Sequence, residues 1–379
     1  MQDRIEADAT ARHGMPLSVT LASALLVVSG FAGTGTAIGA EAPAGGRIGY
    51  VLTDRHWAIF ETEDGAAECP KGFNLGPREQ YSAQFPENDG VERTVVETRL
   101  LREGRQWHPT LVEKDDFEFY AAQGNTSVGL NLDGVVDDND FVSPDGELTG
   151  IDNQMYRVIG CIAHYRTGGI IHHFENKFAQ QYNDNRWIIE ITDVDDLAND
   201  DEVTVNVYRG MDDLLTDASG EAFIAGATQR VDTRWGQTYM AKTTGKIVDG
   251  VLMTQPIDTI RVPWSSTFDT SGFQVFRGLQ MELNLTTDSA EGLIAGYTDV
   301  EAFNHQLNTT WSTHHQSYGQ LSSLSQYHAM RKFADGYPDE ETGENTAISS
   351  AINVKMTRVA VLHPEEEFEN AVSQADGRD

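Results

Sequence analysis

The sequence predicts a mainly β protein, arranged as a jelly-roll-like β-sandwich with one or two short helices. Segments rich in β-branched and aromatic residues recur along the chain with polar turns between them. Val203, Val205 and Val207 alternate with polar residues, which is typical of a strand with one buried face. Asp249-Gly250 separates two apolar runs and predicts a type I′ hairpin. The predicted strands are 48–52, 94–101, 155–162, 187–191, 203–208, 246–254, 259–262, 273–285 and 293–297.

Two helices are expected to interrupt the strands. Apolar side chains recur every three or four residues in 170–183 and again in 320–334, which is the period of a helix face. Gly336 and Pro338 follow the second segment and provide a stop. Both helices are expected to be short.

The histidines near the first helix allow a second interpretation. If Gly168-Gly169 formed a tight hairpin, His164 and His173 would face each other across two strands with Glu175 beside them. Two histidines and one carboxylate form a transition-metal site. The helical spacing in the same segment favours a helix instead, with these histidines on the surface.

Residues 1–40 have the features of a secretory signal segment. An uncharged apolar stretch at 17–28 is followed by small residues, as in a signal with its cleavage zone. The acidic beginning of the chain leaves Met15 as an alternative start. No later apolar run has membrane length, so we expect no membrane span in the mature chain. The prediction is a periplasmic or secreted protein whose residues 41–379 form a single large β-rich domain, with a soft junction at 212–234.

The charge balance excludes some partners. The chain has 59 acidic against 27 basic residues, a formal net charge of −32, and no cluster of Lys and Arg. Such a field repels the phosphates of nucleic acids and anionic membrane surfaces. Solubility explains the acidity, with cation binding as the alternative.

Cys69 and Cys161 are the two cysteines of the chain. An even number in an exported protein predicts one disulfide, which would close a large loop. The alternative is two separate buried thiols, since neither cysteine lies in a redox or zinc-binding motif.

A stretch rich in carboxylates predicts a calcium site. Its acidic side chains lie close together in a glycine-bearing segment and repel one another unless a cation neutralises them, and oxygen ligands suit Ca²⁺. The spacing does not fit an EF-hand, because Phe141 falls on a required ligand position. A solvated acidic loop is the alternative. The candidate ligands are Asp133, Asp137, Asn139, Asp140, Asp145 and Asp152.

No catalytic or cofactor motif is present: the sequence lacks a GxSxG elbow, an HExxH site, a P-loop and a GxGxxG turn. Paired carboxylates, which glycan hydrolases use, are not excluded. Carboxylates next to apolar residues are the formal candidates, namely Glu79, Glu175, Glu190 and Glu282.

Three tryptophans in polar surroundings are candidates for stacking against a sugar ring: Trp235, Trp264 and Trp311. A place in the hydrophobic core is the alternative for each. These features favour a non-catalytic exported protein that binds a glycan or a protein partner and is stabilised by calcium. The alternatives are a calcium-dependent enzyme that acts on polysaccharides through paired carboxylates and a structural protein of the cell envelope.

Overall fold

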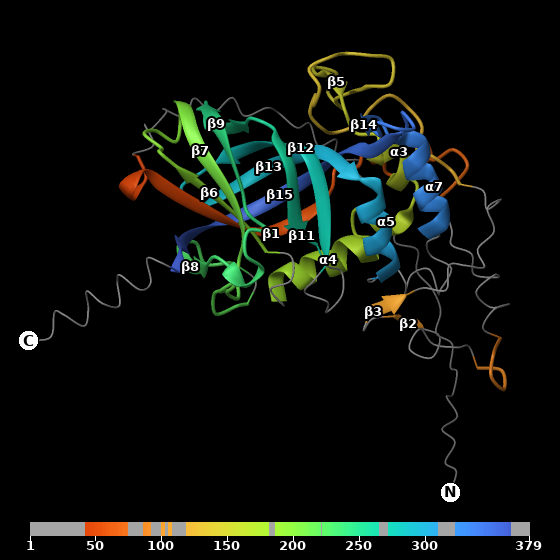
Figure 1. The fold of residues 1–379 in the computed structure, drawn as a ribbon, viewed down its shortest axis with the longest axis horizontal. Helices are drawn as coiled ribbons and strands as arrows, with labels where there is room; N and C mark the ends of the chain where they lie inside the picture. Colours follow the sequence, from red (N-terminus) through yellow and green to blue (C-terminus); the bar gives the residue numbers. More distant parts are fainter. Residues whose placement is uncertain are drawn as a thin grey trace, which may run out of the picture. The chain divides into compact units, whose positions relative to one another are not determined.

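Antiparallel strands close into an eight-stranded barrel in the part of the chain that the structure describes (Figure 1). The structure is a computed structural model and describes residues 42–74, 86–91, 100–102, 105–107, 119–181, 186–220, 222–264, 272–309 and 323–364. The strand order is β1-β6-β7-β9-β10-β12-β13-β15, and β15 also pairs with β1. The barrel strands are β1 (Arg47–Trp57), β6 (Trp187–Thr192), β7 (Asp200–Arg209), β9 (Ala241–Val248), β10 (Val251–Thr254), β12 (Phe273–Leu285), β13 (Ser289–Asp299) and β15 (Asn345–Leu362).

Shorter strands and several helices surround the barrel. β11 pairs with β12, β8 runs parallel to β15, and β14 pairs with β15. The additional strands are β2 (Leu100–Arg102), β3 (Arg105–Trp107), β4 (Phe141–Val142), β5 (Thr149–Ile151), β8 (Ala227–Arg230), β11 (Ile257–Pro263) and β14 (Gly336–Pro338). The helices are α3 (Met155–Ile159), α4 (Ile170–Gln181), α5 (Val300–Thr309) and α7 (Ser323–Phe333), with 3₁₀ turns at η1 (Ala44–Gly46), η3 (Ala163–Tyr165) and η4 (Thr233–Trp235).

The predicted sandwich is wrong, although the mainly β composition is confirmed. The strand that decides this is β15, which was not among the predicted strands. It pairs antiparallel with β13 along one side and with β1 along the other. A sandwich leaves open edges on two sheets, whereas this double pairing joins the first barrel strand to the last and removes the edges.

Strand alternation directs apolar side chains into the barrel. Val203, Val205 and Val207 of β7 are buried inside, as the sequence predicts, and Ile189 and Ile191 of β6 lie beside them in the same core. Aromatic rings meet around Trp264 in this core, where they come from Trp57, Trp187 and Phe276. The small barrel therefore has a packed interior.

The helix predictions are confirmed by α4 and α7, and the hairpin prediction by β9 and β10. Asp249 and Gly250 have φ of 51° and 81°, the positive values that a type I′ turn requires. The predicted strand at 155–162 is wrong, because α3 lies there. Figure 1 shows α3, α5 and α7 gathered at one end of the barrel, and β8 at the other.

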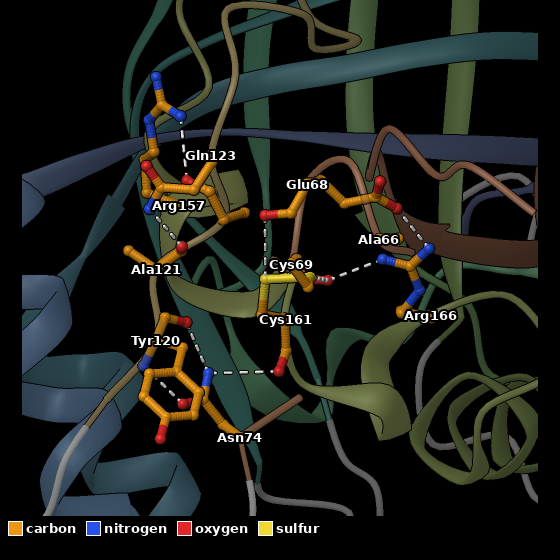
Figure 2. Close-up of a disulfide and its surroundings, with 12 residues drawn as sticks. Ala66, Glu68, Cys69, Asn74, Tyr120, Ala121, Gln123, Arg157, Cys161 and Arg166 are labelled. Atoms are coloured by element: carbon orange, nitrogen blue, oxygen red, sulfur yellow. Dashed lines mark hydrogen bonds and ion pairs between the residues drawn. A yellow bond between two sulfur atoms is a disulfide. The ribbon is translucent and has the colours of Figure 1, made fainter. Parts of the chain in front are cut away.

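The predicted disulfide between Cys69 and Cys161 is confirmed. It joins the loop after β1 to the residues that follow α3, and both cysteines are buried. Figure 2 shows Asn74 beside the bridge, where its side-chain amide donates to the carbonyls of Tyr120 at 2.7 Å and Cys161 at 3.2 Å. Arg166 and Glu68 form an ion pair of 2.7 Å on the other side. A buried disulfide is compatible with an extracytoplasmic location.

The signal segment predicted at 1–40 lies outside the described residues. Within them, no helix combines the length and the apolar character needed to cross a bilayer. The division of the chain into domains stays a prediction.

Candidate functional site

A cavity of about 540 Å³ lies on the outer wall of the barrel, near β8. Its floor comes from the first residue of β1 and from β6 and β7, and its walls come from residues 231–240 and from the chain after β15. Cavities of this size hold small organic ligands. The lining residues are Arg47, Glu190, Thr192, Asn206, Tyr208, Val231, Thr233, Met240, His363 and Pro364.

The alternation of β6 and β7 places polar groups on this floor. Since Ile189 and Ile191 point into the barrel, Glu190 between them faces outward. Asn206 faces outward in the same way and lies directly opposite Glu190 in the strand pairing. The same period that builds the core therefore assembles a polar outer surface.

The segment between β7 and β9 covers this surface. A bridge between Gly210 and Val231 and the parallel pairing of β8 with β15 hold the segment on the barrel. Val231 packs with Val51, Ile188 and Val359 in a small apolar cluster on the outer wall. Residues 212–234, predicted as a soft junction, thus include part of the cavity wall.

Buried charges fix the position of this wall. Asp232 is 2% exposed and forms ion pairs with Arg209 at 3.4 Å and with Arg234 at 2.8 Å. The pKa of Asp232 is lowered: burial opposes the shift, and hydrogen bonds from Arg234 together with the charge of Arg209 outweigh it. Breaking the buried pair of Asp232 with Arg209 is costly, so it stabilises the wall at this point.

Glu190 is the central charged group of the cavity. It is 1% exposed, and its Oε2 accepts a hydrogen bond from His363 Nε2 at 3.0 Å. Its Oε1 lies 3.5 Å from Arg47 Nε and has no hydrogen-bond partner. A buried acceptor without a donor costs free energy, and the charge of Arg47 beside Oε1 offsets part of this cost.

The remaining lining groups offer neutral polar contacts and an aromatic ring. Thr192, Asn206 and Thr233 carry hydroxyl and amide groups. The ring of Tyr208 meets the His363 ring edge to face, with centroids 5.3 Å apart. The arrangement combines one carboxylate, two cationic or hydrogen-bonding partners and an aromatic surface, which suits the binding of a polar ligand.

The predicted stacking tryptophans lie in different places. Trp264 is 2% exposed in the barrel core, where Arg55 lies 3.5 Å from its ring centroid and its Nε1 donates to Glu175 at 3.1 Å. Trp235 is 36% exposed and meets Tyr239 edge to face, outside the cavity lining. Trp311 lies outside the described residues. The structure therefore brings none of the described tryptophans into the cavity.

The predicted calcium ligands lie in the chain around β4 and β5, and β5 is labelled on the yellow loop in Figure 1. Several of their oxygens accept backbone N–H groups of the loop itself. Asp133 accepts from Val135, Asp137 from Asn139, Asp140 from Asp137, Asp145 from Glu147 and Asp152 from Leu132. The side-chain amide of Gln154 holds the loop by donating to the Asn139 carbonyl at 2.7 Å.

Burial changes the acidity of two carboxyl groups in this region. Burial raises the pKa of Asp152 to about 6, and the charges of Asp133, Asp140 and Asp335 add to the shift. Burial also raises the pKa of Asp335 to about 6, with Asp140 contributing. The structure thus adds Asp335, which the sequence could not connect to this loop. Calcium binding here stays a prediction.

Three potential metal ligands lie close together in another part of the structure. Among the described residues, Asp54, His56 and His172 alone form a set of three potential ligands whose atoms all lie within 4.8 Å of one another. Asp54 and His56 lie near the C-terminal end of β1, whereas Arg47 begins the strand. The set considered from the sequence, His164 with His173 and Glu175, is not brought together in this way in the described residues.

Of the formal carboxylate candidates, Glu190 and Glu175 are buried and Glu282 is exposed, while Glu79 lies outside the described residues. Sequence reasoning missed Arg47 and His363, which approach Glu190 only through strand pairing. A signal was present in β6, where a glutamate sits inside a run of isoleucines. Comparison of the chain with protein-family models, curated proteins and solved structures found no match.

Proposed function

We propose that the chain is an exported binding protein whose outer-wall cavity takes a small neutral polar ligand, of which a saccharide unit fits best. The observation that carries the proposal is the buried carboxylate of Glu190, held between His363 and Arg47 beneath a cavity of about 540 Å³. Saccharides present closely spaced hydroxyl groups that donate to carboxylates and accept from Arg and amide groups.

The charge of the cavity supports a neutral ligand. Glu190 is offset by Arg47 and by the hydrogen bond from His363, so the lining has little net charge. The chain as a whole carries −32, which disfavours the approach of anions. The ring of Tyr208 adds an aromatic surface of the kind on which sugar C–H groups pack.

Binding is favoured over polysaccharide hydrolysis because the lining contains a single carboxylate, Glu190. Hydrolysis by the usual route needs two carboxyl groups about 5 to 10 Å apart on either side of the scissile bond. The second carboxyl group that hydrolysis needs would have to come from a residue that does not line the cavity.

The test is calorimetric titration of the purified protein with neutral mono- and disaccharides. Glu190→Gln should lower the affinity at least tenfold, because it replaces a charged acceptor by a neutral one. Glu282→Gln, an exposed glutamate on β12, is the matched control and should bind as the wild type does. Asn206→Ala gives a second variant in case the buried substitution prevents folding.

Two results would overturn the proposal. One is the absence of binding to any neutral saccharide at millimolar concentration. The other is equal affinity in the wild type, Glu190→Gln and Asn206→Ala, which would place the ligand elsewhere.

Export is part of the proposal and rests on the segment 1–40 together with the disulfide. N-terminal sequencing of protein recovered from the extracytoplasmic fraction should begin near residue 41. Recovery of the chain only from the cytoplasm, with its cysteines reduced, would contradict it.

A further inference from the structure

Two neighbouring elements bring three potential metal ligands together at the end of β1. Asp54 and His56 lie two residues apart on the strand, and His172 lies in the first turn of α4. His56 Nδ1 is 3.7 Å from Asp54 Oδ1, and His172 Nε2 is 4.0 Å from Asp54 Oδ2. The two imidazole rings have centroids 5.1 Å apart.

These separations are too long for hydrogen bonds but close to those between ligands of one ion. With metal–ligand bonds of about 2.1 Å, two ligands of a tetrahedral ion lie about 3.4 Å apart. Small side-chain rotations of Asp54, His56 and His172 would therefore bring their ligand atoms into a coordination shell.

An irregularity in β1 turns the first two ligands outward. Ile48, Tyr50 and Leu52 point into the barrel, but the pairing with β15 shifts register between Leu52 and Asp54. After the shift, Arg55 and Trp57 are buried, and Asp54 and His56 lie on the outer, half-exposed side. A β-bulge re-aims side chains in this way. Without it, strict alternation would direct Asp54 and His56 into the core.

Helix α4 is fixed on the same part of β1. Asn176 accepts from the backbone N–H of Arg55 at 2.8 Å and donates to its carbonyl at 2.9 Å. One turn further, Gln180 donates to the carbonyl of Thr53 at 2.9 Å. His172, Asn176 and Gln180 are spaced by four residues and lie on one helix face. The bonds that dock the helix thus also place His172 against Asp54.

The nitrogens that face Asp54 are available for coordination. His56 Nδ1 and His172 Nε2 are both buried and have no hydrogen-bond partner. The three side chains are only partly exposed, at 31% for Asp54, 33% for His56 and 22% for His172.

Asn353 supports this arrangement from β15. It lies opposite His56 in the strand pairing, and its side-chain amide is 3.2 Å from His56 Nε2. When Nδ1 of a histidine binds an ion, Nε2 carries the proton and donates to a neighbouring acceptor. In the structure Asn353 Nδ2 faces His56 Nε2, and a 180° flip of the amide places its oxygen there for this role.

We propose that Asp54, His56 and His172 bind a divalent first-row transition-metal ion at the junction of β1 and α4. Two imidazoles and one carboxylate form a donor set suited to Zn²⁺ and Fe²⁺, whereas hard ions such as Ca²⁺ prefer oxygen ligands alone. The net charge of −32 raises the local concentration of cations. The site is independent of the Glu190 cavity and does not require the proposed saccharide binding.

The test is calorimetric titration of chelator-treated protein with Zn²⁺. We expect one ion per chain at this site, and at least tenfold weaker binding in His56→Gln and in His172→Gln. His173→Gln is the matched control, because His173 is the next residue of α4 and is exposed. It should keep the affinity of the wild type. Asn353→Asp should bind more tightly, since a carboxylate accepts the Nε2 proton of His56 more strongly.

The proposal is overturned if the wild type does not bind Zn²⁺, or if His172→Gln and His173→Gln lose affinity equally. Melting curves of the metal-free variants show whether they are folded. If a ligand variant does not fold, anomalous diffraction at the zinc edge from wild-type crystals decides the matter. Zinc density beside Asp54 supports the site, and density elsewhere or none refutes it.

Discussion

The side-chain amide of Asn176 replaces a strand at Arg55, because it accepts from the Arg55 N–H and donates to the Arg55 carbonyl. The pairing of β1 with β6 reaches only to Val51, and within the described part of the chain no strand pairs with the last residues of β1 on that side. An open strand edge leaves backbone groups unpaired. Helix α4 covers this edge and so links the barrel to the proposed metal site.

Asn176→Leu should therefore destabilise the protein by about 2 to 4 kcal/mol, since it leaves two buried backbone groups of Arg55 unsatisfied. Urea unfolding followed by circular dichroism measures the change. Gln180→Leu removes one half-buried hydrogen bond and should cost only about 1 kcal/mol. Equal losses in the two variants would show that Asn176 has no special role.

The disulfide should contribute substantially to stability. Replacing Cys69 and Cys161 together by Ala should lower the free energy of unfolding by about 2 to 5 kcal/mol, because the bridge restricts a long segment of the unfolded chain. Reduction of the wild type should have a similar effect, and the double variant should not respond to the reductant. A wild type that unfolds at the same urea concentration with and without reductant would contradict this expectation.

The acidic loop should make stability depend on pH. The pKa of Asp152 rises from 3.8 to about 6 on folding, so the folded state binds more protons than the unfolded state between these values. The stability supplied by this protonation is present below about pH 4 and is lost as pH rises through 6. Asp152→Asn removes the titration, so its melting temperature relative to the wild type should increase between pH 5 and pH 7.5, as differential scanning calorimetry can measure.

Asp138→Asn is the control for this measurement, because Asp138 is exposed in the same loop. Its melting temperature relative to the wild type should stay nearly constant over the same pH range. A constant difference for Asp152→Asn as well would mean that Asp152 is not protonated at pH 5.

Calcium should stabilise the acidic loop if the loop binds it, because the ion would neutralise neighbouring carboxylates. We predict that millimolar Ca²⁺ raises the melting temperature and that a chelator lowers it, with a smaller response in Asp137→Asn and Asp140→Asn. Elemental analysis of the purified protein should detect the ion. If chelation changes neither melting temperature nor protease sensitivity, and no calcium co-purifies, the loop is only solvated.

The sequence alone determined the features that depend on neighbouring residues. The alternating valines of β7, the helical periods of α4 and α7 and the turn at Asp249-Gly250 all follow from local stereochemistry, and all are present. The cysteine pair was predictable because the chain has only two. The strand predicted at 155–162 failed because α3 is buried on most sides, and a short, continuously apolar run does not distinguish a strand from a helix.

Only the tertiary structure decided how the strands close and where the sites form. β15 contacts both β1 and β13, and no local pattern specifies the partners of a strand. Glu190 and His363 are separated by 173 residues in sequence, yet they are 3.0 Å apart because β6 and the end of β15 both lie beside β1. Asp54 and His56 meet His172 only because a register shift turns β1 outward at the point where α4 docks. Such contacts depend on the packing of the whole barrel, since it is the burial of its apolar side chains that selects one arrangement of strands.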